Sequence, residues 1–377
     1  MKAIKNARVV LKDTVWEGCV LYEGQQIHAF TNAAPEGVDT IDARGCYLLP
    51  GLIDTHIHGC KGADVCDGTA DALGVISGEL IRHGVTRFLP TTLSQGDECL
   101  AGVFQAVAQF MGNEPGAGAL GVHLEGPFIN PLRAGAQNQE YISAPREELV
   151  DMANGLIRLI TLAPEMAKCD FITSMKRRGI QLSMGHTDAT YEQACAGIKA
   201  GVTRATHCFN AMRPLNHTEP GAAGAALLCP IETELIADGL HVHRDICALL
   251  YVIKGPEKIT LVSDSIRTAG MPYGRYIHGG MDVNYNENGA RIPGGRLAGS
   301  TLTLEKAVSN MMQFCKVPIW EAVRMASYNP AKALGLDGLF GSIQPGHIAD
   351  FVLANEDMNV LMTWRDGEVL FHSDALV

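Results

Sequence analysis

Apolar runs alternate with stretches of helical composition through the middle of the chain. The stretches between the runs are rich in Ala and Glu, and this alternation is typical of repeated β/α units. Eight such units in about 280 residues match the size and rhythm of a TIM barrel. A doubly wound sheet would carry a glycine fingerprint after its first strand, and none is present. We therefore predict an α/β fold with a (β/α)8 TIM barrel at its centre. The runs are Leu52–His58, Val85–Thr91, Leu120–Glu125, Ile157–Leu162, Ile180–His186, Val202–His207, Glu234–Asp238 and Ile259–Asp264.

The two ends of the chain have a different pattern from the middle. Short β-like runs separated by polar turns precede the barrel, and similar runs return at Ile348–Leu353 and Val360–Trp364. No helical period is visible in the first of these regions. We therefore expect both ends to join in one small β domain made of residues 1–49 and 341–377, with residues 50–340 forming the barrel.

A Gly- and Asn-rich stretch between Tyr276 and Arg296 interrupts the β/α rhythm. It contains short strand-like pieces separated by turn residues, which is the pattern of a β-hairpin. We predict a hairpin excursion here, followed by the last helix of the barrel from near Ser300.

Composition limits the kind of protein that this chain can be. With 377 residues, of which 47% are apolar and 19% charged, it can bury a large core. A net charge of −11 without a run of Lys or Arg argues against nucleic acid or an anionic membrane surface as a partner. The eleven cysteines form no CxxC pair, and no signal sequence or long apolar segment is visible, so we expect reduced cysteines and a cytoplasmic protein.

Side chains that bind metals stand at the carboxyl ends of the predicted barrel strands. A His-x-His pair ends the first run, so both imidazoles project to the same side of that strand. Other histidines and carboxylates end the third, fifth, sixth and eighth runs, and the carboxyl ends of barrel strands meet at one face. Imidazoles and carboxylates without thiolates suit one or two ions of Zn²⁺ or a similar divalent metal. The six residues are His56, His58, Glu125, His186, His207 and Asp264.

Such a set of groups suits the hydrolysis of an amide. A divalent cation lowers the pKa of a bound water to about 7, and a nearby carboxylate can accept the water's proton and pass it to the leaving nitrogen. Asp264, at the end of an apolar strand, is the candidate for that proton transfer. The alternative is that each of these residues only caps the next helix. Cys60 and Cys208 lie near the ligand positions in sequence. They are therefore also candidate ligands, but weaker ones than the imidazoles and carboxylates.

Several motifs resemble those of the N-acetylglucosamine-6-phosphate deacetylase family of the amidohydrolase superfamily. The segment Pro50–His58 resembles the opening barrel strand of the superfamily, and further similarity extends over essentially the whole chain. The resemblance implies a β/α barrel with a small β-sandwich made from both termini, usually a homodimer, that removes acetate from the sugar phosphate. The other matching segments are His123–Pro127, Gly185–His186, Thr206–Met212, Glu219–Gly221, Ala237–His241, Leu297–Thr301, Asn329–Ala331 and Gly341–Asp350.

The resemblance also implies roles for individual residues. One group holds the catalytic ion: Glu125, His186 and His207. A second group can hold another ion: His56, His58 and Asp264. A third group matches positions that contact the sugar phosphate: Asn210, the Ala211 backbone and His241.

Two substrate-facing positions depart from the family pattern. Thr218, which follows the candidate contact His217, stands where the family usually has a phosphate-binding arginine, and threonine offers no charge. Gln137 stands where the family commonly has a histidine that polarises the substrate carbonyl. Either Arg213 or Arg133 supplies the missing cation, or the substrate differs. It would then be an unphosphorylated N-acetyl sugar or another epimer, such as N-acetylgalactosamine 6-phosphate.

Two functions are alternatives to a deacetylase whose small-molecule substrate is an N-acetyl sugar. A cyclic-amide hydrolase of the dihydropyrimidinase or dihydroorotase type would resemble members with a carboxylated lysine, but the Ile157–Leu162 run has no lysine. A catalytically inactive barrel that senses metal or sugar would give no reason to keep Asp264 beside a full set of ligands.

Overall fold

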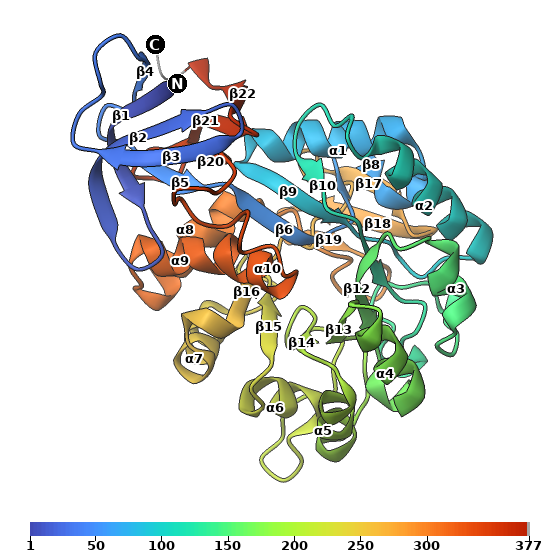
Figure 1. Cartoon of the computed structure of the whole chain (residues 1–377). Helices are drawn as coiled ribbons and strands as arrows, with labels where there is room; N and C mark the ends of the chain where they lie inside the picture. The colour runs from blue at the N-terminus through green and yellow to red at the C-terminus, as the bar shows by residue number, and fades with distance from the viewer. Residues whose placement is uncertain (375–377) are drawn as a thin grey trace.

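A sheet built from both ends of the chain lies beside a larger region of parallel strands and helices, as Figure 1 shows in blue and red at one end of the molecule. This computed structural model describes residues 1–374, so the last three residues of the predicted small domain, 375–377, lie outside the described residues. The sheet has eight strands in the order β22-β21-β20-β5-β1-β2-β3, with β4 paired to β1. Its strands are β1 Lys2–Val10, β2 Val15–Glu23, β3 Gln26–Thr31, β4 Asp39–Asp42, β5 Tyr47–Pro50, β20 Phe351–Ala354, β21 Val360–Arg365 and β22 Glu368–His372.

The pairing of β5 with β20 joins the two ends of the chain. These strands run antiparallel, and Leu48 lies opposite Leu353 in the register. Large apolar side chains from both ends, including Tyr22, Phe351 and Trp364, are almost fully buried in one cluster. Full burial of an apolar side chain contributes about 1.5–3 kcal/mol, so neither end provides this core alone.

Two parallel sheets form the centre of the larger region. A three-stranded sheet has the order β10-β9-β6, and a six-stranded sheet runs from β11 to β16 in chain order. Isolated parallel bridges join the sheets, one between Thr91 and His123 and the other between Ile57 and Ser265. Each predicted run overlaps one strand. The strands are β6 Leu52–Ile57, β9 Val85–Pro90, β10 Gly118–Ala119, β11 Val122–Glu125, β12 Ile157–Leu162, β13 Gln181–Met184, β14 Arg204–Ala205, β15 Glu232–Leu235 and β16 Ile259–Leu261.

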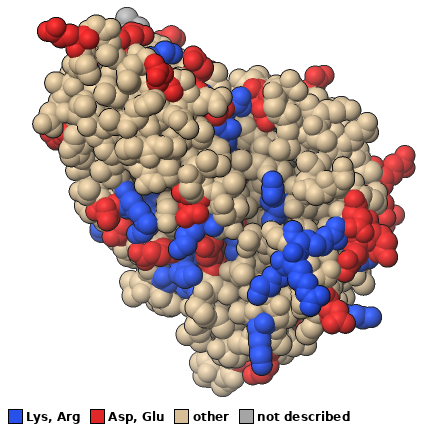
Figure 2. Space-filling model, viewed as in Figure 1, with Lys and Arg blue, Asp and Glu red and all other residues tan. Residues whose placement is uncertain are grey.

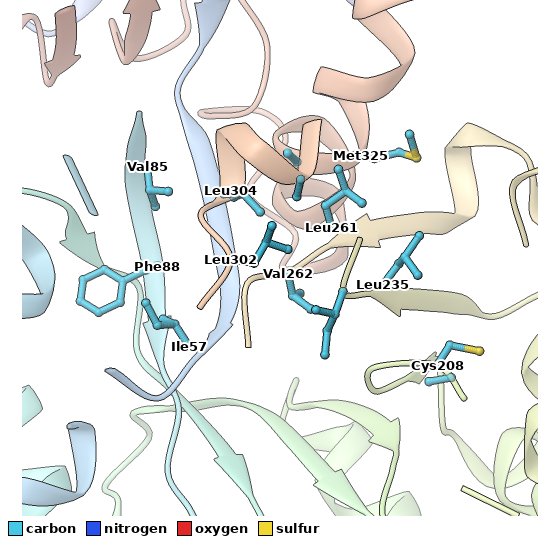
Figure 3. Close-up of a cluster of buried hydrophobic side chains, with 14 of the residues drawn as sticks. Ile57, Val85, Phe88, Cys208, Leu235, Leu261, Val262, Leu302, Leu304 and Met325 are labelled. Atoms are coloured by element: carbon cyan, nitrogen blue, oxygen red, sulfur yellow. The ribbon is translucent and has the colours of Figure 1, made fainter. Parts of the chain in front are cut away.

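Helices follow most of these strands and cover them with apolar faces. Helix α1, for example, starts after Thr69, whose side chain accepts a hydrogen bond from Ala72 N, and it buries Leu73, Ile76 and Leu80. Figure 3 shows Leu304 and Met325 of the helices beside Leu261 of a strand, in the cluster that also contains Val85 and Phe88. The helices are α1 Ala70–Arg82, α2 Asp97–Phe110, α3 Glu147–Met152, α4 Cys169–Arg177, α5 Tyr191–Ala200, α6 Gly221–Leu228, α7 Arg244–Lys254, α8 Leu304–Cys315, α9 Ile319–Ala326 and α10 Tyr328–Ala333.

The predicted hairpin excursion is a three-stranded antiparallel sheet of β17 Gly274–His278, β18 Met281–Asn286 and β19 Gly289–Arg291. Buried His278 faces Asp64, with 2.9 Å between Nδ1 and Oδ2, close to the short β7 Gly59–Cys60 and β8 Ala63–Asp64. The chain then passes the cavity described below before α8 begins. The helix expected near Ser300 therefore starts four residues later, and two more helices follow it.

No helix within residues 1–374 is long and apolar enough to cross a bilayer. The face of the molecule in Figure 2 carries acidic and basic side chains near one another, with a group of Lys and Arg at the lower right. This mixture agrees with the lack of basic runs in the sequence.

Candidate metal centre and substrate cavity

Unusual backbone conformations at the strand ends direct the predicted ligands to one place. His186, His207 and Asp264 lie two or three residues beyond β13, β14 and β16, and their φ angles are +46°, +28° and +48°. Residues other than glycine rarely adopt this left-handed backbone region. Each one that does so carries a conformational strain on the order of 1–3 kcal/mol. The surrounding structure therefore holds these residues in strained positions at the cavity.

Three of the predicted ligands form a tight cluster: Glu125, the last residue of β11, with His186 and His207. Glu125 Oε1 lies 3.2 Å from His186 Nε2 and 3.0 Å from His207 Nε2. The two imidazole Nε2 atoms are 3.1 Å apart. All three side chains are buried, so a single small cation can be enclosed between them.

The His-x-His pair faces the other side of Glu125. His58 Nε2 lies 3.3 Å from Glu125 Oε2 and 3.3 Å from His56 Nε2. Asp264 Oδ1 completes this side, at 3.4 Å from His56 Nε2 and 3.2 Å from His58 Nε2. The structure therefore brings all six sequence-predicted ligands together, and Glu125 lies between the two groups.

In three of the four histidines, a hydrogen bond at the outer nitrogen sets the orientation of the ring. His56 Nδ1 lies 3.1 Å from Glu234 Oε2, His58 Nδ1 is 3.2 Å from the carbonyl oxygen of Thr91, and His186 Nδ1 is 3.0 Å from that of Arg133. An Nδ1–H that donates to such an oxygen leaves an unprotonated Nε2 with its lone pair toward the cluster. This is the tautomer that binds a metal ion.

The spacing of the donor atoms fits a small divalent ion. Ligands about 2.1 Å from a tetrahedral Zn²⁺ are about 3.4 Å from one another, close to the separations within both groups. Cys60 and Cys208 belong to neither group. Burial raises the pKa of both thiols to about 12, which disfavours the thiolate that a metal would need.

The electrostatics of the cluster favour positive charge between its carboxylates. Burial lowers the pKa of His58, but Asp264 and Glu125 outweigh it and raise that pKa to about 9. Burial likewise raises the pKa of Glu125, whereas His56 and His186 lower it well below its usual value. A divalent cation would supply the same positive charge without protons on the imidazoles.

A fully buried ion pair that sequence reasoning missed supports His56. Glu234 on β15 accepts from the backbone N–H of His207 at 3.3 Å and pairs with Arg204 of β14 at 3.2 Å. Burial raises the pKa of Glu234, but the contacts with His56 and Arg204 lower it to about 2. The only signal in the sequence was a pair of charged residues within predicted strands whose other inward positions are expected to be apolar.

Another missed residue, His123, packs against His56 with 4.6 Å between the ring centroids. Its Nε2 lies 2.8 Å from Thr161 Oγ1, and its Nδ1 lies 3.0 Å from the carbonyl oxygen of Thr55. Burial lowers the pKa of His123 to about 3. The imidazole of His123 is therefore neutral, and it packs against the His56 ring without adding charge to the cluster.

Gln137 contacts the cluster through Glu125. Its amide nitrogen donates to Glu125 Oε2 at 2.6 Å, and its amide oxygen accepts from the backbone N–H of Ser94 at 2.6 Å. Gln137 also lines the cavity in front of the cluster. One of its two N–H groups is thus used to position Glu125, and the other is available to a substrate.

The cluster opens into a cavity of about 440 Å³ that three of the predicted substrate contacts also line: Asn210, Ala211 and His241. His241 Nδ1 lies 2.6 Å from Asp238 Oδ2. Phe209 and Ala211 have φ angles of +77° and +49°, and within residues 1–374 the Ala211 N–H donates to no other group. This wall of the cavity therefore offers a backbone donor and an imidazole to a polar ligand.

Three other predicted substrate contacts, Arg213, His217 and Thr218, do not line this cavity. His217 and Thr218 are exposed, and Thr218 N and Oγ1 both donate to Asn216 Oδ1. Arg213 does not line the cavity either, and its guanidinium pairs with Asp188 Oδ2 at 2.8 Å. Arg133 does line the cavity, but it pairs with Asp188 Oδ1 at 2.8 Å.

Known proteins with the same architecture are similar over nearly the whole chain. The model of the amidohydrolase family matches residues 47–370. An N-acetylglucosamine-6-phosphate deacetylase from Lysinibacillus sphaericus is 38% identical, over 94% of this chain and 92% of that protein. An N-acetylgalactosamine-6-phosphate deacetylase from Escherichia coli O157:H7 is 35% identical, over 98% and 99%. The crystal structure of N-acetylglucosamine-6-phosphate deacetylase from Pasteurella multocida matches with a TM-score of 0.93 and 32% identity, over 98% of this chain and 99% of that chain.

Proposed function

The chain belongs to the amidohydrolase family, and we propose that it is a metal-dependent deacetylase that converts N-acetylglucosamine 6-phosphate to glucosamine 6-phosphate and acetate. The convergence of four imidazoles and two carboxylates at one end of a cavity carries this proposal. A cyclic-amide hydrolase is disfavoured because Glu125, rather than a lysine, lies between the two groups of ligands.

We assign the metal ligands to the six residues of the cluster and favour Zn²⁺ as the ion. Glu125, His186 and His207 would hold the principal ion. His56, His58 and Asp264 would hold a second ion with Glu125 between them. Nitrogen and carboxylate ligands without thiolate suit Zn²⁺ or a metal of similar character.

The residues of the site divide the chemistry among them. A divalent cation held by these residues would polarise an amide carbonyl and lower the pKa of a nearby water to about 7. Asp264 would accept a proton from the attacking water and pass it to the leaving nitrogen. Gln137 donates its second N–H to the carbonyl oxygen, while its first keeps Glu125 in place. All six candidate ligands are buried, so bulk water has little access to their donor atoms.

Asn210, the Ala211 backbone and His241 would contact the sugar phosphate from the wall of the cavity. The N–H of Ala211, which donates to no group of residues 1–374, can donate to an anionic oxygen of the ligand. Arg213, His217 and Thr218 would lie farther out, since none of them lines the cavity.

We also propose that the parallel strands form one closed (β/α)8 barrel and that both termini form a β-sandwich. The bridges at Thr91–His123 and Ile57–Ser265 support closure, because they link β9 to β11 and β6 to the end of β16. A bridge from Gln26 to Ile348 supports a folded-over terminal sheet. An apolar cluster drawn only from residues 4–48 and 343–364 supports the domain division at residues 49–50 and 340–341, although Leu49 and Val352 pack into the larger core.

A homodimer fits the surface of α7. This helix exposes Ile246, Leu249, Val252 and Ile253, of which Val252 is 78% exposed. Their spacing places all four on one side of the helix, and an apolar patch of this kind is typical of a protein interface. Light scattering should give the mass of two chains, and Val252→Glu should shift the protein toward one.

A cytoplasmic location is proposed from the cysteines. All eleven are free thiols, and even the close pair Cys195 and Cys229 has 3.8 Å between its sulfur atoms. Unpaired cysteines in this number suit a reducing compartment.

A deacetylation screen with metal-reconstituted protein tests the function. We expect acetate release from N-acetylglucosamine 6-phosphate to exceed that from the 6-phosphates of N-acetylgalactosamine and N-acetylmannosamine, and from the three unphosphorylated sugars. The galactosamine derivative is the second candidate, because the Escherichia coli O157:H7 relative that acts on it matches this chain over 98% of its length. If no N-acetyl sugar released acetate, the proposed function would be wrong.

A further inference from the structure

Two arginines of the hairpin region face the substrate cavity. Arg291 ends β19, and Arg296 follows the turn after it; both line the cavity together with His241 and the metal-ligand cluster. Arg291 lies opposite Leu297, and Ile292 N donates to the carbonyl oxygen of Arg296 at 3.0 Å. The turn therefore holds the two cationic residues close together in sequence and space, at the open side of the site.

Within residues 1–374, neither of these arginines forms an ion pair with a carboxylate. Arg291 Nε donates to the carbonyl oxygen of Asn288 at 3.1 Å, and its Nη1 donates to that of Gly295 at 2.5 Å, so only backbone groups hold it. The guanidinium of Arg296 contacts no acidic group of residues 1–374. Both therefore keep their full charge for a ligand.

The other arginines near the cavity differ in this respect. Arg133 and Arg213 share the carboxylate of Asp188, with 2.8 Å to one oxygen each. Their ion pairs lower the pKa of Asp188 through hydrogen bonds from Arg213 and Arg133. A phosphate that bound either one would have to compete with Asp188, so the cation expected from these residues is already paired.

We propose that Arg291 and Arg296 bind the phosphate of the substrate and make this enzyme selective for a phosphorylated amino sugar. The proposal rests on the proposed function, and it takes the positive charge from Arg291 and Arg296 rather than from Arg133 or Arg213. Arg291 is held by backbone carbonyls and presents a fixed edge, whereas Arg296 is exposed and free to close on the ligand. A guanidinium pairs with phosphate through two parallel hydrogen bonds.

The double variant Arg291→Ala/Arg296→Ala tests this with two substrates. We expect KM for N-acetylglucosamine 6-phosphate to rise about 10- to 100-fold, with kcat within about twofold. The kcat/KM for unphosphorylated N-acetylglucosamine should stay unchanged. Arg275→Ala is the matched control, because this exposed arginine lies on β17 of the same hairpin but does not line the cavity.

A binding measurement separates the two proposals. Calorimetry compares glucosamine 6-phosphate with glucosamine on the metal-loaded protein, whether or not it turns over any substrate. The native protein should prefer the phosphate, and the double variant should lose that preference. A double variant that keeps the preference, or that keeps the native KM, would overturn the inference and leave the deacetylase activity standing. Failure of the native protein to release acetate would instead count against the proposed function.

Discussion

The ligands of the site occupy residues whose backbone and side chains are both constrained. His186, His207 and Asp264 keep left-handed φ angles, and a Cβ added to neighbouring Gly185 would lie 2.7 Å from Thr206 and Thr161 atoms. Little room remains for the backbone to relax when a ligand is replaced. Substitutions that keep the shape of the side chain are therefore the most informative ones.

The change Asp264→Asn keeps the shape and removes the proton acceptor. We expect metal to remain bound through the other ligands, while acetate release falls by about 10²- to 10⁴-fold. Metal analysis and acetate assays of the same preparation measure both quantities. Near-normal turnover would refute the role of Asp264 in proton transfer.

Replacing Glu234 with Gln tests how His56 is oriented. The amide weakens the acceptor for His56 Nδ1–H, and loss of such an outer partner lowers metal affinity by about 10- to 100-fold. Competition with a chelator gives the affinity of each ion. The single variant leaves the buried charge of Arg204 without its carboxylate partner, which could destabilise the fold. The double variant Glu234→Gln/Arg204→Met removes both charges, so it distinguishes weaker metal binding from misfolding. Unchanged affinity in both variants would exclude a positioning role.

Sequence reasoning selected the six residues that the structure brings together, because each stands at or near the end of an apolar run in a repeated pattern. It did not find Glu234 and Arg204, whose role depends on which strands are neighbours in space. It also gave no role to Arg291 and Arg296, because a turn in a Gly-rich stretch looks like any exposed loop. The contacts that decide these roles join distant parts of the chain.

At the scale of elements, several strands are shorter than the apolar runs that predicted them, although β12 matches its run from Ile157 to Leu162. The run Val202–His207 contains only β14, Arg204–Ala205, and the run Ile180–His186 contains β13, Gln181–Met184. Extended pairing stops where the backbone turns to positive φ at the ligand. Apolar pattern therefore located the strands, but the strained residues at their ends determined where the ladder stops.

A pH-dependent contact joins α1 to α8. His83 Nδ1 lies 2.8 Å from Glu305 Oε1, and its Nε2 is 3.4 Å from Glu79 Oε1. Burial lowers the pKa of His83, but the contact with Glu305 outweighs it and the pKa is raised. The stabilisation is therefore complete below the unfolded pKa of about 6.5, and it is lost as pH rises through the folded pKa.

The variant His83→Gln should accordingly be less stable than the native chain at pH 6, by up to about 1 kcal/mol. The difference in free energy of unfolding should shrink by pH 9. Urea unfolding at both pH values measures it. A difference that stays constant or grows with pH would contradict this role of His83.

At the scale of the whole molecule, buried ion pairs fasten the terminal sheet to the parallel strands. Arg87 of β9 donates to Asp350 at 2.8 Å and to Asp366 at 2.6 Å. Asp350 is only 6% exposed and precedes β20, whereas Asp366 follows β21. Strands from the end of the chain are thus held against one near its beginning.

Removing the cation of this contact should destabilise the protein strongly. Arg87→Met leaves a buried carboxylate unpaired, which costs about 3–5 kcal/mol, and Arg87→Met/Asp350→Asn should recover part of the loss. Exposed Arg244→Met is the control, with an expected change within about 0.5 kcal/mol. Urea unfolding gives all three values, and equal stability of Arg87→Met and Arg244→Met would contradict the account.

The pairing of β5 with β20 has a consequence for synthesis on the ribosome. Residues 1–50 emerge first, but the edge of β5 gains its neighbour only after about 300 further residues have been translated, which takes roughly 15–60 s. During that interval a nascent chain carries an open strand edge able to pair with other chains. Only the edge of β5 has to wait for its partner, so chains that stop before residue 351 keep this edge open and should aggregate.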